Sequence, residues 1–170
     1  DEILNQAKHI CEIGADVVEW RVDWFEEVNN YESVENATKQ LREILGETPI
    51  LFTFRTAKEG GERAIEPDEY VELNEEIAKS GYVDLVDVEA FIGDTYVEKV
   101  VKTSHECGVK VIASNHDFRK TPPKAELISR MRKMQELGAD IPKIAVMPQS
   151  TEDVLTLLSA TEEMRRCYAD

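Results

Sequence analysis

The feature that most constrains the fold of this chain is a regular alternation of short apolar runs with longer amphipathic stretches. The apolar runs are rich in Val, Ile and Phe and are too short for most helices, which favours strands. They cover residues 16–22, 49–54, 82–88, 109–113 and 141–147. The amphipathic stretches predict helices near 1–13, 31–45, 67–80, 94–107, 122–137 and 151–168. Strict alternation of strand and helix is typical of a parallel sheet.

The spacing of the runs supports this interpretation. The predicted strands start near residues 17, 50, 83, 109 and 141, so successive starts lie 26 to 33 residues apart. A strand–helix–strand unit needs about 30 residues. Glycines follow several predicted helices just before the next strand, where a left-handed helix cap is needed: Gly14, Gly81, Gly108 and Gly138. No linker or low-complexity tract interrupts the series, so we expect one domain.

The ends of the predicted strands separate a closed (β/α)8 barrel from an open, doubly wound sheet. In the first strand, Glu19, Arg21 and Asp23 share one face by the two-residue period. Ionisable groups in register on a buried strand need mutual pairing or a ligand. In a barrel, polar groups gather at the C-terminal strand ends, where active sites form. The Gly-rich turn of a dinucleotide-binding sheet is missing from the sequence. We therefore favour the α/β TIM-barrel class.

Composition narrows the possible partners. The chain has 170 residues, with 35 Asp and Glu against 20 Lys and Arg, and a formal net charge of −15. This balance, without a basic cluster, predicts no nucleic-acid partner and no anionic membrane surface. No apolar run is long enough to span a bilayer, and the first residues do not resemble a signal peptide. Cys11, Cys107 and Cys167 are far apart and odd in number, which indicates reduced cytoplasmic thiols and no metal site.

The most informative single residue is Lys143, because it lies inside an otherwise apolar predicted strand. Desolvation there would lower the pKa of the lysine. A neutral amine attacks carbonyl groups, so Schiff-base chemistry is one hypothesis. The alternative is a structural lysine paired with a buried carboxylate such as Asp87 or Glu89.

A histidine ends the strand just before the lysine strand, so the side chains of His116 and Lys143 could share the mouth of a barrel. Histidine is the natural acid and base near neutral pH, although the residue alone favours a structural role. Glu59, in a glycine-containing loop, could accept a hydrogen bond from this ring or could be a solvated loop acid. His9 and His105 fall in predicted helices without the spacing of metal ligands.

Three further charged residues, Glu19, Arg21 and Arg55, lie near predicted strand ends. The two guanidinium groups can each donate paired hydrogen bonds to an anion, and the carboxylate can accept hydrogen bonds from hydroxyl groups, so these residues are suited to a hydroxylated or anionic substrate. An internal network of ion pairs explains them equally well.

At these positions the sequence resembles the type I 3-dehydroquinate dehydratases, the Schiff-base dehydratases of the shikimate pathway. The matching segments occur in the right order across most of the chain. They are Glu19-Trp20-Arg21-Val22-Asp23, residues 52–61, Asn115-His116-Asp117-Phe118 and residues 139–149. The family is a (β/α)8 barrel, usually a homodimer, and it uses neither cofactor nor metal.

The resemblance also implies a role for each matching residue. Lys143 would form an imine with the ketone of 3-dehydroquinate, and His116 would remove and return protons while Glu59 orients its ring. Glu19, Arg21 and Arg55 would contact substrate, and Asp87 would be a supporting polar neighbour. By this resemblance Lys143, His116 and Glu59 are catalytic residues, and Glu19, Arg21 and Arg55 are substrate-binding residues. The implied reaction is a syn elimination of water that yields 3-dehydroshikimate.

The length qualifies the resemblance, because barrels of this kind have about 250 residues. Residues 1–170 are expected to form a single partial barrel domain of about five strands, starting in a helix. By comparison with the family, the first strand and the last two strand–helix units, which carry groups for the substrate carboxylate, have no counterpart. Another lysine-imine barrel enzyme, such as a class I aldolase, and a catalytically incompetent fragment remain alternatives.

Overall fold

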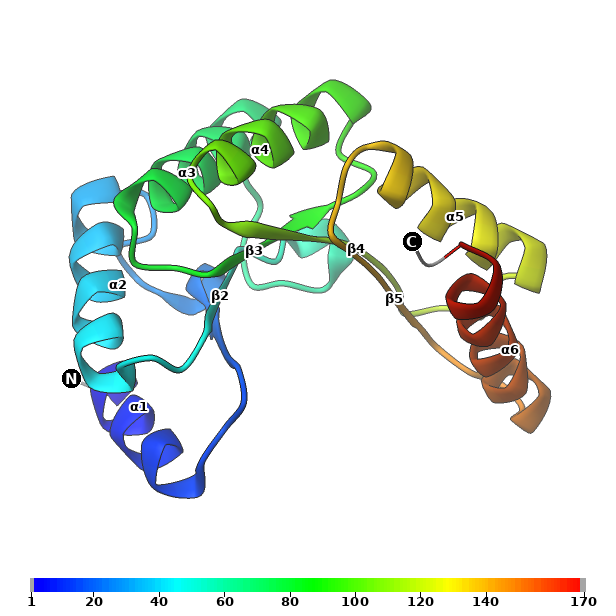
Figure 1. Cartoon of the computed structure of the whole chain (residues 1–170), viewed down its shortest axis with the longest axis horizontal. Coiled ribbons are helices and arrows are strands. Elements are labelled where there is room, and N and C mark those ends of the chain that lie inside the picture. Colours follow the sequence, from blue (N-terminus) through cyan, green and yellow to red (C-terminus); the bar gives the residue numbers. More distant parts are fainter. Residues whose placement is uncertain (1, 169–170) are drawn as a thin grey trace.

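The computed structural model describes residues 2–168, which contain five parallel strands and six α-helices in strict alternation (Figure 1). The strands are β1 (Val18–Arg21), β2 (Ile50–Thr53), β3 (Leu85–Glu89), β4 (Lys110–Asp117) and β5 (Ile141–Val146). The helices are α1 (Glu2–Ile13), α2 (Tyr31–Leu45), α3 (Pro67–Ser80), α4 (Asp94–Glu106), α5 (Lys124–Glu136) and α6 (Thr151–Tyr168). Two short 3-10 helices, η1 (Val22–Trp24) and η2 (Ala57–Glu59), follow β1 and β2.

The strands lie in the sheet in sequence order, β1-β2-β3-β4-β5, and every pair is parallel. Figure 1 shows the helices arranged as an arc along one side of a curved sheet, with α1 at one end and α6 at the other. A curved sheet of consecutive parallel strands, each followed by a helix on the outside, is the arrangement of a section of a (β/α)8 barrel. The predicted fold class is confirmed.

The main core lies between the sheet and the helices. It contains the fully buried side chains of Phe52, Val86 and Val111 from three central strands, and of Tyr70 and Val100 from α3 and α4. A smaller cluster joins α5 to α6 through Leu127, Met131, Ala160 and Met164. Figure 1 shows these two helices side by side at one end of the arc.

Several predicted boundaries need correction. The first strand ends at Arg21 rather than residue 22, because the chain turns into η1 there and Asp23 lies beyond the strand. The fourth strand continues to Asp117 rather than ending at 113, because Asn115 to Asp117 pair with β5. The fifth helix begins at Lys124, after two prolines that precede rather than form its first turn. The four glycines predicted to cap helices all have positive φ, as expected.

None of the helices in residues 2–168 combines the length and the apolar character needed to cross a membrane. The three cysteines are exposed and free of disulfides.

Candidate active site

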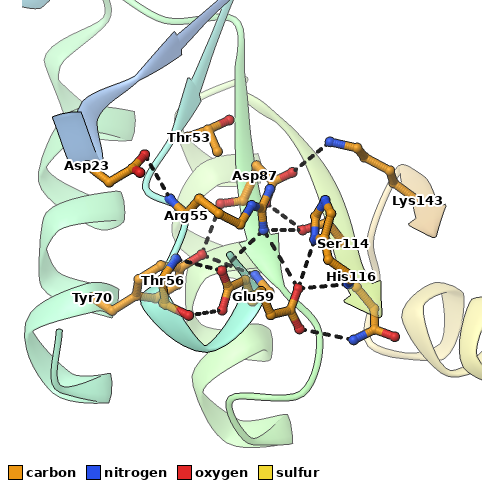
Figure 2. A network of polar contacts seen from close by, with 12 residues as sticks. Asp23, Thr53, Arg55, Thr56, Glu59, Tyr70, Asp87, Ser114, His116 and Lys143 are labelled. Atoms are coloured by element: carbon orange, nitrogen blue, oxygen red, sulfur yellow. Dashed lines mark hydrogen bonds and ion pairs between the residues drawn. The ribbon is translucent and has the colours of Figure 1, made fainter. Parts of the chain in front are cut away.

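The polar residues predicted at the strand ends converge on one buried guanidinium, that of Arg55 (Figure 2). Arg55 follows β2 and is only 3% exposed. Its Nη2 donates to Asp87 Oδ1 at 2.8 Å, and its Nη1 donates to Ser114 Oγ at 2.8 Å and Glu89 Oε1 at 3.2 Å. Burial would lower the pKa of Arg55, but the neighbouring acidic groups, Asp87 first, outweigh it and raise the pKa.

The carboxylates around Arg55 are held by further donors. Glu89 accepts from the backbone N–H of Thr56 at 2.8 Å and from its hydroxyl at 2.7 Å. Burial nevertheless raises the pKa of Glu89 above its ordinary value. The Tyr70 hydroxyl donates to the Asp87 carbonyl at 3.2 Å and accepts the Glu89 N–H at 3.1 Å, and its pKa is raised well above the usual value, chiefly by burial. The sequence pattern does not identify Tyr70 as part of the site, because it predicts an ordinary residue on the apolar face of a helix.

One carboxylate oxygen in the cluster lacks a hydrogen-bond partner among residues 2–168. Asp87 Oδ2 is buried, while Oδ1 accepts from Ser114 at 2.6 Å as well as from Arg55. The Lys143 ammonium faces Oδ2, with Nζ at 3.7 Å, which is an ion pair but too long for a normal hydrogen bond. Figure 2 shows this contact at the edge of the network.

Lys143 stands on β5, in register with Ser114 of β4. Its side chain is 39% exposed. The prediction that the Lys143 side chain is buried and desolvated is therefore wrong for this structure. The physical reason is that β5 is an edge strand of the described sheet, and all its residues are half-buried or exposed.

His116 and Glu59 form a close pair, although they are 57 positions apart in the chain. His116 Nδ1 lies 2.9 Å from Glu59 Oε2, the same oxygen that accepts the His116 backbone N–H at 3.0 Å. The other oxygen of Glu59 accepts from Asn115 Nδ2 at 3.0 Å. Since an ionised carboxylate only accepts hydrogen bonds, Nδ1 must carry the proton, and Nε2 of a neutral ring is left with a free lone pair.

The loop that carries Glu59 is shaped by two glycines. Gly60 has φ +87, and a β-carbon there would strike the ring of Phe118. A β-carbon on Gly61 would overlap the carbonyl of Arg55. The close approach of the loop to β2 therefore requires glycine, and it brings Glu59 to the end of β4.

Glu19 and Arg21 lie on β1, at the other side of the site. Arg21 makes two parallel hydrogen bonds to Asp23, each 2.8 Å long, and Glu19 accepts from Thr53 at 2.8 Å. For Asp23, burial would raise the pKa, but Arg21 and two backbone N–H groups lower it. Both predicted residues are thus present beside the cluster, and Glu19 remains exposed.

The structure brings together Arg55, Asp87, His116, Glu59 and Lys143 from three strands and one loop. His9 pairs with Glu12 on the surface, and His105 contacts Asp140 at the opposite end of β4 and β5. Within residues 2–168, no three His, Cys, Asp or Glu side chains are grouped so as to hold a metal ion.

The family model described as type I 3-dehydroquinase matches residues 1–169. The chain belongs to this family. It is 53% identical to the 3-dehydroquinate dehydratase of Clostridioides difficile strain 630 over 169 residues, and 57% identical to that of Escherichia coli strain HS over 168 residues. These alignments cover 99% of this chain and 66% and 67% of the two relatives.

Solved structures of the type I dehydroquinase family agree with this placement. The chain superposes with a TM-score of 0.97 on a Clostridium difficile type I 3-dehydroquinate dehydratase bearing covalently modified comenic acid, at 53% identity. The match covers 99% of this chain and 67% of that one. A putative deoxyribose-phosphate aldolase from Toxoplasma gondii has a TM-score of 0.68 at 11% identity, which shows a shared fold only. The chain thus spans about two thirds of the length of its family relatives.

Proposed function

We propose that the site of this type I dehydroquinase chain dehydrates 3-dehydroquinate to 3-dehydroshikimate through an imine on Lys143. The observation that carries the proposal is the placement of an amine and a histidine–carboxylate pair on adjacent strands. Lys143 on β5 is in register with Ser114 on β4. Ser114 precedes His116 by two residues, so these two side chains share one face of β4. The Glu59–His116 contact of 2.9 Å supplies an oriented base beside that amine.

In the first step, the Lys143 amine attacks the substrate ketone, and loss of water gives an iminium. The positive nitrogen withdraws electrons from the adjacent carbon, so the α-proton becomes acidic enough for His116 Nε2 to remove it. Asp87 Oδ2 is well suited to face the iminium, because it is buried, accepts no hydrogen bond from the described residues and lies 3.7 Å from Lys143 Nζ.

In the second step, the enamine expels the β-hydroxyl, and the protonated His116 returns its proton as water leaves. Hydrolysis of the conjugated imine then releases 3-dehydroshikimate and restores the amine. A single histidine serves both transfers only if the proton and hydroxyl lie on the same ring face, so the elimination is syn. The resulting imidazolium is stabilised by Glu59, which both orients the ring and balances its charge.

The geometry changes the role that we propose for Arg55. It already donates to Asp87, Glu89 and Ser114, and its side chain is almost fully buried, whereas the Arg21 side chain is 36% exposed. We therefore assign it the task of holding the acidic groups in place, and we leave direct substrate contact to Glu19 and Arg21. The proposal also includes what the family resemblance implies: a homodimer in the cytoplasm that works without cofactor or metal.

An absorbance assay tests the proposal, because dehydration creates a conjugated enone carboxylate. Lys143→Ala should abolish turnover, and His116→Ala should slow it by roughly 10²- to 10⁴-fold. Lys102→Ala, which alters an exposed lysine on α4, is the matched control and should leave the rate unchanged. Retained turnover in Lys143→Ala would refute the imine mechanism.

A further inference from the structure

A partly open cavity of about 300 Å³ lies beside the candidate active site, with which it shares Glu59 and His116. It is formed by the loop after β2, the start of α3 and the loop after β3. Its walls include Glu59 and His116, but not Lys143, Arg55, Asp87, Glu19 or Arg21. Such a volume is at the lower end of the range for small-molecule sites and is large enough for a single ring.

Most of the wall is apolar. The side chains of Ile65, Pro67, Tyr70, Phe91 and Ile92 line it, together with two alanines. Aromatic and aliphatic walls of this kind favour a flat, apolar ligand body.

The two acidic groups of the wall are fully engaged with protein donors. Both oxygens of Glu59 accept hydrogen bonds from β4, and both oxygens of Glu89 accept from Arg55 or Thr56. These groups are already held by protein donors, and they repel a negative charge placed deep in the cavity. An anionic ligand must therefore keep its charge at the mouth.

The mouth has the opposite charge. Lys58 is exposed there and has no ion-pair partner among residues 2–168. Lys58, Phe91 and His116 also line an adjoining open hollow, which contains Arg119 and Arg130 together with Asp117 and Glu126. Arg130 is ion-paired with Glu126. The Phe91 ring lies 5.9 Å from the Arg130 guanidinium. Lys58 and Arg119 are therefore the cations beside this aromatic wall that have no ion-pair partner among residues 2–168, in a chain with a net charge of −15.

From this polarity we propose that the cavity is a second binding site, for a small aromatic carboxylate whose ring enters the apolar interior and whose carboxylate pairs with Lys58. The ligand would contact the Glu59–His116 pair without contacting Lys143. Binding here would change the environment of the His116 ring and limit its movement, and the proposed dehydration depends on this ring.

Histidine NMR with benzoate as the probe tests the site in the 170-residue chain. The three histidines give three ring signals, which can be assigned with single variants. Benzoate should shift the His116 signal saturably, with a dissociation constant on the order of 1 mM. His9 and His105 serve as internal controls and should not move, because neither lines the cavity. Shifts of all three signals, or no saturable shift, would overturn the proposal.

Three variants separate this site from other modes of binding. Lys58→Met should weaken benzoate about 3-fold, the size expected for an exposed ion pair, and leave the neutral analogue benzyl alcohol unchanged. Lys8→Met, on the exposed surface of α1, is the matched control. Lys143→Ala should bind benzoate as the native chain does. Loss of binding in Lys143→Ala would place the ligand in the active site, and an unaltered affinity in Lys58→Met would refute the assigned orientation.

Discussion

Replacing Arg55 by Met should destabilise the chain strongly, because it removes the shared cation from several buried acidic groups. The guanidinium lies 2.8 Å from Asp87 and 3.2 Å from Glu89, and both carboxylates are almost fully buried. Breaking a buried ion pair from one side costs about 3–5 kcal/mol. For a chain of this size, each kcal/mol lowers the melting temperature by about 2–4 °C, so Tm should fall by about 6–20 °C.

The same variant should show a distinct pH dependence. Burial already raises the pKa of Glu89, and loss of the guanidinium will raise it further. The folded variant then binds more protons than the unfolded chain, so its stability falls as the pH rises and recovers as the pH is lowered from 7 toward 5. Protonation removes one of the uncompensated charges, which is the physical reason for the recovery.

Urea denaturation at pH 7 and at pH 5 measures both effects. Arg165→Met, which breaks an exposed pair with Glu162 on α6, is the control and should leave the midpoint unchanged. A loss below about 1 kcal/mol at pH 7, or a loss of equal size at both pH values, would contradict the assignment of Arg55 as the organiser of the cluster.

Two further changes test the local geometry. Gly61→Ala should cost about 1–3 kcal/mol of stability and weaken the dehydration, because its β-carbon would overlap the Arg55 carbonyl and push the Glu59 loop away. The control Gly81→Ala meets no atom and should cost only the strain of its positive φ. Thermal melting and the absorbance assay compare the two variants, and equal effects would contradict the need for a close approach at Gly61. Partial burial would raise the pKa of Asp140, but hydrogen bonds from Lys110, His105 and a backbone N–H lower it to about 2. The ionised carboxylate therefore stabilises the folded chain above its ordinary pKa of 3.8, and this stability is lost as the pH falls toward 2. Asp140→Asn should flatten this part of a stability–pH curve measured by urea denaturation, and an unchanged curve would contradict the role of Asp140.

Much of the fold follows from periodicity in the sequence. Apolar runs of strand length at steps of about 30 residues predicted all five strands and their parallel order, since each is followed by an amphipathic helix. Boundaries were less predictable where tertiary contacts decide them. Asn115 to Asp117 are polar and read as a loop, yet they continue β4 because β5 pairs with them.

The candidate site was predictable as a set of residues but not as a set of partners. Strand-end charges and the family resemblance identified Lys143, His116, Glu59 and Arg55. Their pairing depends on distances that no local pattern encodes, so the three hydrogen bonds that Arg55 donates within the cluster could not be foreseen. The exposure of Lys143 was also unpredictable, because an apolar strand sequence does not reveal that the strand lies at the edge of the described sheet.

The central claim, that Lys143 forms the reactive imine and His116 then drives elimination, is tested most directly by borohydride reduction in the presence of 3-dehydroquinate. Intact mass and peptide mapping should place the adduct on Lys143, with part of it lighter by one further water because elimination has occurred. His116→Ala should trap mainly the heavier adduct, which retains the β-hydroxyl, and Lys143→Ala should trap none. No adduct on the native chain, or an adduct that persists in Lys143→Ala, would contradict the account.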